Sequence, residues 1–127
     1  MAKVILVSPS DDLDCSGDRP PLGILYIASS LRDSGHEVKI ADMNHKSENE
    51  LYTEVMKFIP NFVGISFTTP LFEEGNRLNK FIKDMHRNIK TIAGGPHPSA
   101  DPESCKDFDY VIVGEGEQSI LEVINEN

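Results

Sequence analysis

The stretch Phe62-Val-Gly-Ile-Ser-Phe-Thr-Thr-Pro70 decides the fold. Its first six residues, Phe62 to Phe67, are almost continuously apolar, which is typical of a strand buried on both faces of a parallel sheet. Thr69 then offers a capping side chain, and Pro70 suits the first position of a helix. The stretch therefore predicts a buried parallel strand that leads directly into a helix.

The same alternation of strand and helix extends through the rest of the chain. Four more segments are short and rich in branched or aromatic residues, and we predict strands at Lys3–Ser8, Val38–Ala41, Thr91–Ala93 and Tyr110–Val113. Apolar residues at helical spacing predict helices within residues 22–34, 47–59, 70–85 and 118–125. Ser47 and Glu50 have the spacing of a capping box, and Asp101 precedes Pro102 as a further expected helix start.

Five strand-helix units in 127 residues indicate one domain that spans residues 1–127. We predict an α/β fold of the doubly wound, flavodoxin-like (Rossmann-type) kind, because right-handed crossovers leave few alternatives. Its five-stranded parallel sheet has the order 2-1-3-4-5, with helices on both faces. Ligands of such sheets bind outside the carboxyl ends of the strands, so the loops at that edge are where a site is expected.

Composition excludes several classes of partner. The net charge of −9 repels polyphosphate backbones and anionic membrane surfaces, so we expect neither a nucleic acid nor a membrane as partner. The longest apolar run is too short to span a bilayer, and no signal peptide is recognisable, which indicates a cytoplasmic protein. Cys15 and Cys105 form no spacing motif, so neither a disulfide nor a zinc site is predicted.

The usual ligands of this fold lack their motifs here. The loop after the first strand, Pro9–Pro20, has no G-x-G-x-x-G turn, and its acidic residues would repel a flavin phosphate. A phosphorylatable receiver domain needs an aspartate after the third strand and a lysine after the fifth, where Thr68 and Gly114 stand instead. Ser66 lacks a nucleophile elbow, so we assign no catalytic residue. Acidic loop clusters are usually solvated, and we assign no metal ligand either.

Small and hydroxyl-bearing residues gather at the predicted carboxyl edge. Glycines let a ligand approach the backbone closely, and hydroxyls can bond a neutral ring or a ribose. The alternative for the paired glycines is a turn with positive φ angles, and the sequence leaves both open. The candidate ligand-binding residues, each near the end of the third, fourth or fifth strand, are Ser66, Thr68, Thr69, Gly94, Gly95, Pro96, Gly114 and Glu115.

Four stretches together resemble a known family. In order they are "PPLGILYIASSLRDSGHEVKIADMN", "VGISFTT", "IAGGPHPS" and "DYVIVGEGEQSILEVI". They are similar to the cobalamin-binding domain at the amino terminus of cobalamin-dependent radical S-adenosylmethionine enzymes. The resemblance implies cobalamin as the cofactor, with its nucleotide tail detached from cobalt and threaded into the sheet edge. Gly94 and Gly95 would then make room for the benzimidazole, Ser66 and Thr68 would bond it, and Gly114 and Glu115 would line the tail pocket.

Two departures limit what the resemblance implies. Cobalamin domains of the methionine synthase and mutase kind carry D-x-H-x-x-G after the first strand, but Pro9–Pro20 contains no histidine, so no histidine lower ligand of cobalt is expected from that loop. The C-x-x-x-C-x-x-C motif of the radical domain is also missing, so this chain alone binds neither S-adenosylmethionine nor a 4Fe-4S cluster. His97 and Cys15 remain alternative lower ligands.

Three functions remain open at this point. The favoured one is the cobalamin module of a larger methyltransferase or related radical enzyme, with the radical domain in cis or in trans. The others are a stand-alone cobalamin carrier or sensor and a scaffold that has lost its ligand. The final predicted helix has neither glycine nor proline to end it, which favours a fragment or a subunit of the larger enzyme.

Overall fold

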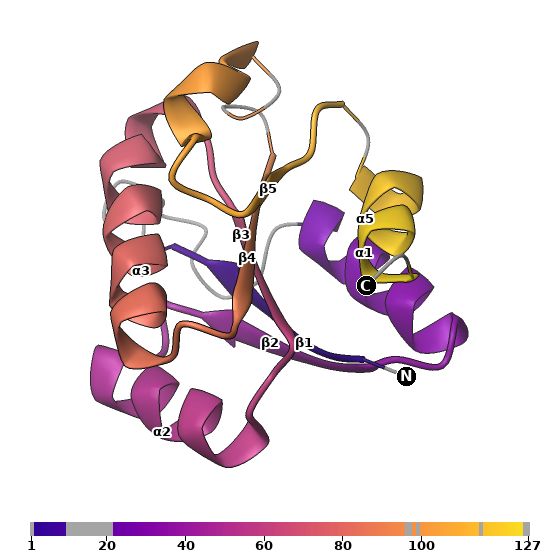
Figure 1. The fold of residues 1–127 in the computed structure, drawn as a ribbon, viewed down its shortest axis with the longest axis horizontal. Helices are drawn as coiled ribbons and strands as arrows, with labels where there is room; N and C mark the ends of the chain where they lie inside the picture. Colours follow the sequence, from indigo (N-terminus) through magenta and orange to yellow (C-terminus); the bar gives the residue numbers. More distant parts are fainter. Residues whose placement is uncertain (1, 10–21, 96–97, 99, 115, 126–127) are drawn as a thin grey trace.

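The five strands form one parallel sheet in the predicted order. The computed structural model describes residues 2–9, 22–95, 98, 100–114 and 116–125. Its sheet has the order β2-β1-β3-β4-β5, and all four strand pairings are parallel (Figure 1). The strands are β1 (Lys3–Ser8), β2 (Glu37–Asp42), β3 (Phe62–Ser66), β4 (Lys90–Gly94) and β5 (Tyr110–Val111).

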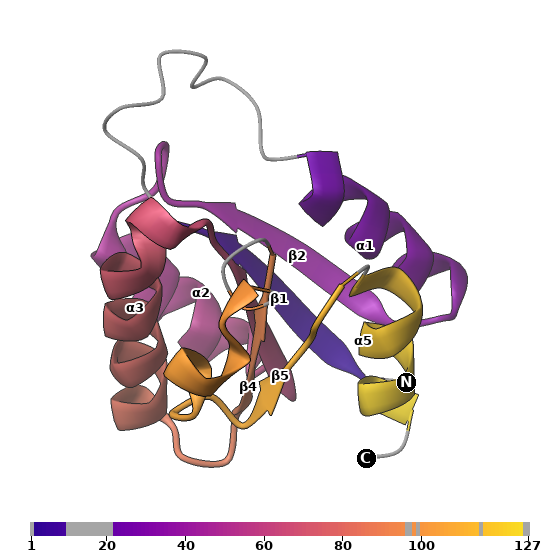
Figure 2. The same ribbon diagram turned by 90° about the horizontal axis from the view of Figure 1, so that it is seen from above.

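Helices cover both faces of the sheet. α1 (Leu22–Asp33) and α5 (Gly116–Asn125) lie on one face, and α2 (Glu48–Phe58) and α3 (Phe72–Met85) lie on the other (Figures 1 and 2). Because successive strand side chains point to opposite faces, β1 contributes to both layers of the core. Val4 and Leu6 pack with α1 and α5, whereas Ile5 and Val7 pack with α2 and α3. β1 and β3 are thus continuously apolar because both faces of each strand are buried, as predicted.

The predicted helix starts have different outcomes. Ser47 caps α2 as predicted, because its side chain accepts a hydrogen bond from Glu50 N while the Glu50 carboxylate accepts one from Ser47 N. The start at Thr69 is shifted: a 3-10 turn spans Thr69–Leu71, and the extended capping conformation falls on Thr68. A helical turn does begin at Pro102 as predicted, but the side-chain cap expected at Asp101 is wrong. Its ψ of 73° does not have the extended value that a capping residue needs, and its side chain makes no capping hydrogen bond to the 3-10 turn at Pro102–Cys105.

Some strand boundaries also differ from the prediction. β3 ends at Ser66, one residue earlier than predicted, although the Phe67 side chain still packs in the same core layer as Ile65. β5 contains only Tyr110 and Val111, although Ile112 N still donates to Ala93 O over 2.8 Å. Of the helices in the described part of the chain, none combines the length and apolar character needed to cross a membrane.

Candidate functional site

The ends of β3 and β4 bring two of the predicted residues together. Ser66 and Gly94 are register partners at the last position of their strands. The Phe67 N–H donates to Gly94 O over 3.1 Å, which extends the pairing by one residue. Thr68 follows and is exposed at the same edge. Ser66, Thr68 and Gly94 therefore form one small, uncharged surface at the carboxyl edge of the sheet.

The two adjacent glycines are glycine for different reasons. Gly95 has a φ of +103°, and a Cβ there would lie 2.8 Å from Ser66 Oγ and 2.9 Å from Phe67 O. Its lack of a side chain is therefore required by the protein itself, as in the turn alternative that the sequence left open. Gly94 has no positive φ, and no described atom beyond its neighbours in the chain lies within 4 Å of an added Cβ. Nothing in the described fold requires glycine at position 94.

The space beside Gly94 lies on the side of the sheet that α1 and α5 cover. Ile92 packs into the core layer beneath these helices, whereas Ala93 packs into the layer beneath α2 and α3. Side chains alternate along a strand, so position 94 projects to the same side as Ile92. Ser66 projects to that side as well, since Ile65 and Phe67 both belong to the opposite layer. A group seated beside Gly94 would thus meet the Ser66 hydroxyl.

The positions of the remaining predicted residues do not distinguish a ligand contact from a structural role. Thr69 lies exposed in the 3-10 turn, and its role as a ligand contact stays a prediction. Gly114 follows β5 with a φ of +85°, which by itself accounts for glycine at this position. The predictions that concern Pro96, Glu115, His97, Cys15 and the loop Pro9–Pro20 fall wholly or mostly outside the described residues.

The described part of the site carries no titratable side chain of its own. Within the described ranges, no group of three or more histidine, cysteine or acidic side chains is arranged to hold a metal ion. Cys105 is fully buried, and this burial is the main reason why the pKa of its thiol is raised. The surface at Ser66, Thr68 and Gly94 is thus suited to a neutral group that forms hydrogen bonds and fills space.

Sequence analysis missed the contribution of Phe67. It was predicted only as the last residue of a strand, but its ring is 2% exposed and packs against Gly75 of α3. A Cβ on Gly75 would lie 2.8 Å from Phe67 Cδ1. The one available signal is a glycine inside an otherwise amphipathic helix, which indicates a close packing contact without saying which residue makes it.

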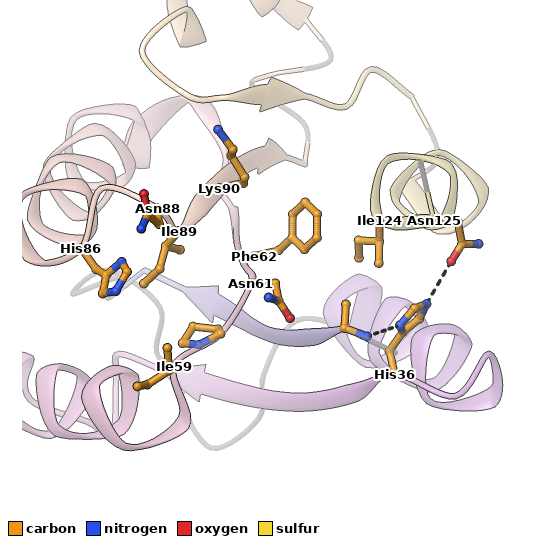
Figure 3. Close-up of a pocket in the computed structure, with 12 residues that line it drawn as sticks. His36, Ile59, Asn61, Phe62, His86, Asn88, Ile89, Lys90, Ile124 and Asn125 are labelled. Atoms are coloured by element: carbon orange, nitrogen blue, oxygen red, sulfur yellow. Dashed lines mark hydrogen bonds between the residues drawn. The ribbon is translucent and has the colours of Figure 1, made fainter. Parts of the chain in front are cut away.

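A pocket of about 490 Å³ lies at the opposite, amino-terminal edge of the sheet (Figure 3). Much of its polar lining already serves the fold. His36 Nδ1 accepts from Ala2 N over 2.9 Å, and its Nε2 lies 3.2 Å from Asn125 Oδ1. Asn61 Oδ1 accepts from Lys3 N over 2.9 Å. His36 thus links Ala2 to Asn125 of α5, and this pocket does not coincide with the predicted site.

Comparison with known proteins supplies the family context. A family model described as the B12 binding domain matches residues 13–124. An uncharacterised methyltransferase of Pyrococcus horikoshii is 34% identical over 112 residues, which cover 84% of this chain and 24% of the relative. The chain spans about a quarter of the length of the curated relatives it matches.

Two solved structures share the fold over nearly the whole chain. One is the cobalamin-dependent S-adenosylmethionine radical enzyme OxsB with aqua-cobalamin bound, with a TM-score of 0.81 and 20% identity over 99% of this chain and 19% of that one. The other is the radical S-adenosylmethionine methyltransferase TsrM from Kitasatospora setae, with a TM-score of 0.80 and 19% identity over 98% of this chain and 25% of that one. At these identities, the likeness shows the fold.

Proposed function

Because this chain belongs to the B12-binding domain family, we propose that it binds cobalamin at the carboxyl edge of its sheet, as one module of a larger radical S-adenosylmethionine enzyme. The observation that carries the proposal is Gly94. No contact with a described residue and no positive φ requires glycine at this position, and the space that it leaves supports a ligand site.

The residues at this edge fit the nucleotide tail of cobalamin. The tail carries a flat benzimidazole and a ribose, and both can pack against backbone and accept hydrogen bonds. Ser66 offers a hydroxyl donor on the side of the sheet to which position 94 projects, and Thr68 offers a second at the exposed rim. Thr69, Gly95, Pro96, Gly114 and Glu115 complete the proposed contacts. Bound cobalamin supplies a cobalt ion that can accept and donate a methyl group.

The radical chemistry would reside elsewhere in the enzyme. The relatives are about four times longer than this chain, and their names include a methyltransferase and a cyclase. We propose that a radical domain, in cis or in trans, binds S-adenosylmethionine and a 4Fe-4S cluster, and that residues 1–127 act as its cobalamin domain. The free, buried Cys105 fits the reducing cytoplasm, where we place the protein.

Cobalamin retention tests the proposal directly. Purified protein mixed with hydroxocobalamin and then desalted should keep the visible spectrum of the cofactor at a ratio of one to one. Gly94→Val should abolish retention while the protein stays folded, because valine suits a strand but would fill the proposed space. Lys90→Val is the matched control, since it places the same side chain on the exposed, opposite end of β4. A colourless eluate from folded wild-type protein would favour the scaffold function instead.

The lower face of cobalt is the second part of the proposal. We propose that no histidine coordinates it, because the loop after β1 contains none, and that the tail is detached from the metal. Electron paramagnetic resonance of the cobalt(II) form should then show no threefold splitting from an axial nitrogen. Splitting that disappears in His97→Ala would make His97 the ligand, and splitting that survives would mean that the benzimidazole is still attached.

A further inference from the structure

Phe67 lies between the two hydroxyl-bearing residues of the proposed site and is enclosed on several sides. Its ring lies 5.9 Å from the Phe108 ring and 6.3 Å from the Phe72 ring, measured between centroids. Gly75 of α3 lies against the ring face, where an added Cβ would come within 3.0 Å of three ring atoms. The ring therefore has no room to move toward α3.

The backbone of Phe67 is held as closely as its ring. Its N–H donates to Gly94 O over 3.1 Å. A Cβ on Gly95 would lie 2.9 Å from Phe67 O and 3.0 Å from Phe67 N. The backbone at Gly95 therefore packs directly against the backbone at Phe67, with no side chain between them. Phe67 thus connects α3, through Gly75, to the glycine turn after β4.

We infer that Phe67 is a positioning residue of the cobalamin site, held in place by Gly75. The inference rests on the proposed function. Phe67 does not touch the proposed ligand space, because its side chain belongs to the core layer beneath α2 and α3. It acts through its neighbours, since any shift of its backbone moves Ser66 and Thr68 on either side and Gly94 through the hydrogen bond.

The Gly75→Ala substitution tests this positioning role, because its added Cβ would displace the Phe67 ring. Ordinary contact begins at 3.4 Å, so a Cβ at 2.8 Å forces the ring and α3 apart by about 0.6 Å. The free variant relaxes by displacing Phe67, and binding has to reverse that displacement. We therefore expect the affinity for hydroxocobalamin, titrated by visible absorbance well below the melting temperature, to fall about tenfold.

Rescue separates positioning from ordinary core packing. In Phe67→Leu with Gly75→Ala, the smaller side chain leaves room for the alanine Cβ, and the affinity should recover to within about threefold of wild type. Ile82→Val is the matched control: it lies in the same helix and core layer, two turns from Gly75, and should lower the melting temperature without changing the affinity. Should Gly75→Ala fail to fold, Phe67→Leu alone should lower the affinity, because a smaller side chain no longer fills the enclosure.

Each result decides between the alternatives. Unchanged affinity in folded Gly75→Ala, or in Phe67→Leu where that variant takes its place, would overturn the positioning role and leave Phe67 a core residue. A loss that the double variant does not recover, or an equal loss in Ile82→Val, would overturn it as well. Wild-type protein that binds no cobalamin would instead overturn the proposed function, and this inference with it.

Discussion

Replacing Gly95 with alanine should cost stability that replacing Gly94 does not. A φ of +103° lies outside the regions that L-residues readily adopt, which costs about 1–3 kcal/mol. The added Cβ also meets Phe67 O at 2.9 Å and Phe67 N at 3.0 Å, and backbone atoms cannot rotate away as the Ser66 hydroxyl can. Overpacking of this kind costs about 1–3 kcal/mol. The two contributions together give a loss of roughly 2–6 kcal/mol for Gly95→Ala.

Thermal and urea unfolding followed by circular dichroism would measure this loss. For 127 residues, an unfolding entropy of about 2.1 cal/mol/K per residue converts it to a fall of roughly 7–22 °C in melting temperature. Gly94→Ala is the matched control. It needs no positive φ and meets no described atom beyond its chain neighbours, so its stability should stay within about 1 kcal/mol of wild type. Equal losses in the two variants, or a loss below about 1 kcal/mol in Gly95→Ala, would refute the assignment of different roles to these glycines.

Three further predictions concern the fold around the site. Ser47→Ala removes the capping box of α2 and should cost about 1 kcal/mol in urea unfolding, with an unchanged midpoint as the contrary result. Burial raises the pKa of the Asp109 carboxyl, but hydrogen bonds from the Lys83 ammonium and the Thr91 N–H outweigh it and hold that pKa below its ordinary value. The stability from this lowered pKa is present above the unfolded-state pKa and is lost as the pH falls through the folded-state pKa, so wild type should lose more stability than Asp109→Asn between about pH 5 and pH 2. Parallel pH profiles would contradict this role for Asp109. Burial also raises the pKa of the Cys105 thiol, so in a variant whose other cysteine is serine it should react with a disulfide reagent only on unfolding; rapid reaction of the native protein would show that the thiol is accessible.

Features encoded in short segments could be predicted from the sequence. The continuous apolar content of Phe62–Phe67 determined a strand buried on both faces, and the alternation of strands with helices led to the parallel sheet and its order. The Ser47 cap was also predictable, since both partners lie within four residues of each other. The position proposed for the site, at the carboxyl edge, followed from topology alone, because parallel strands end together. In these cases either the interacting residues are close in sequence, or a general rule for parallel sheets applies.

Contacts between distant segments could only be decided by the tertiary structure. Gly94 and Gly95 are equivalent in the sequence, but only at Gly95 would an added Cβ collide with Phe67, a residue 28 positions earlier, and only the packing of β3 against β4 brings them together. The contact of Gly75 with Phe67 likewise depends on how α3 docks on the sheet. A sequence specifies which backbone positions lack a side chain, whereas the atoms that would collide with that side chain come from other strands and helices, and their positions are determined only when the core is packed.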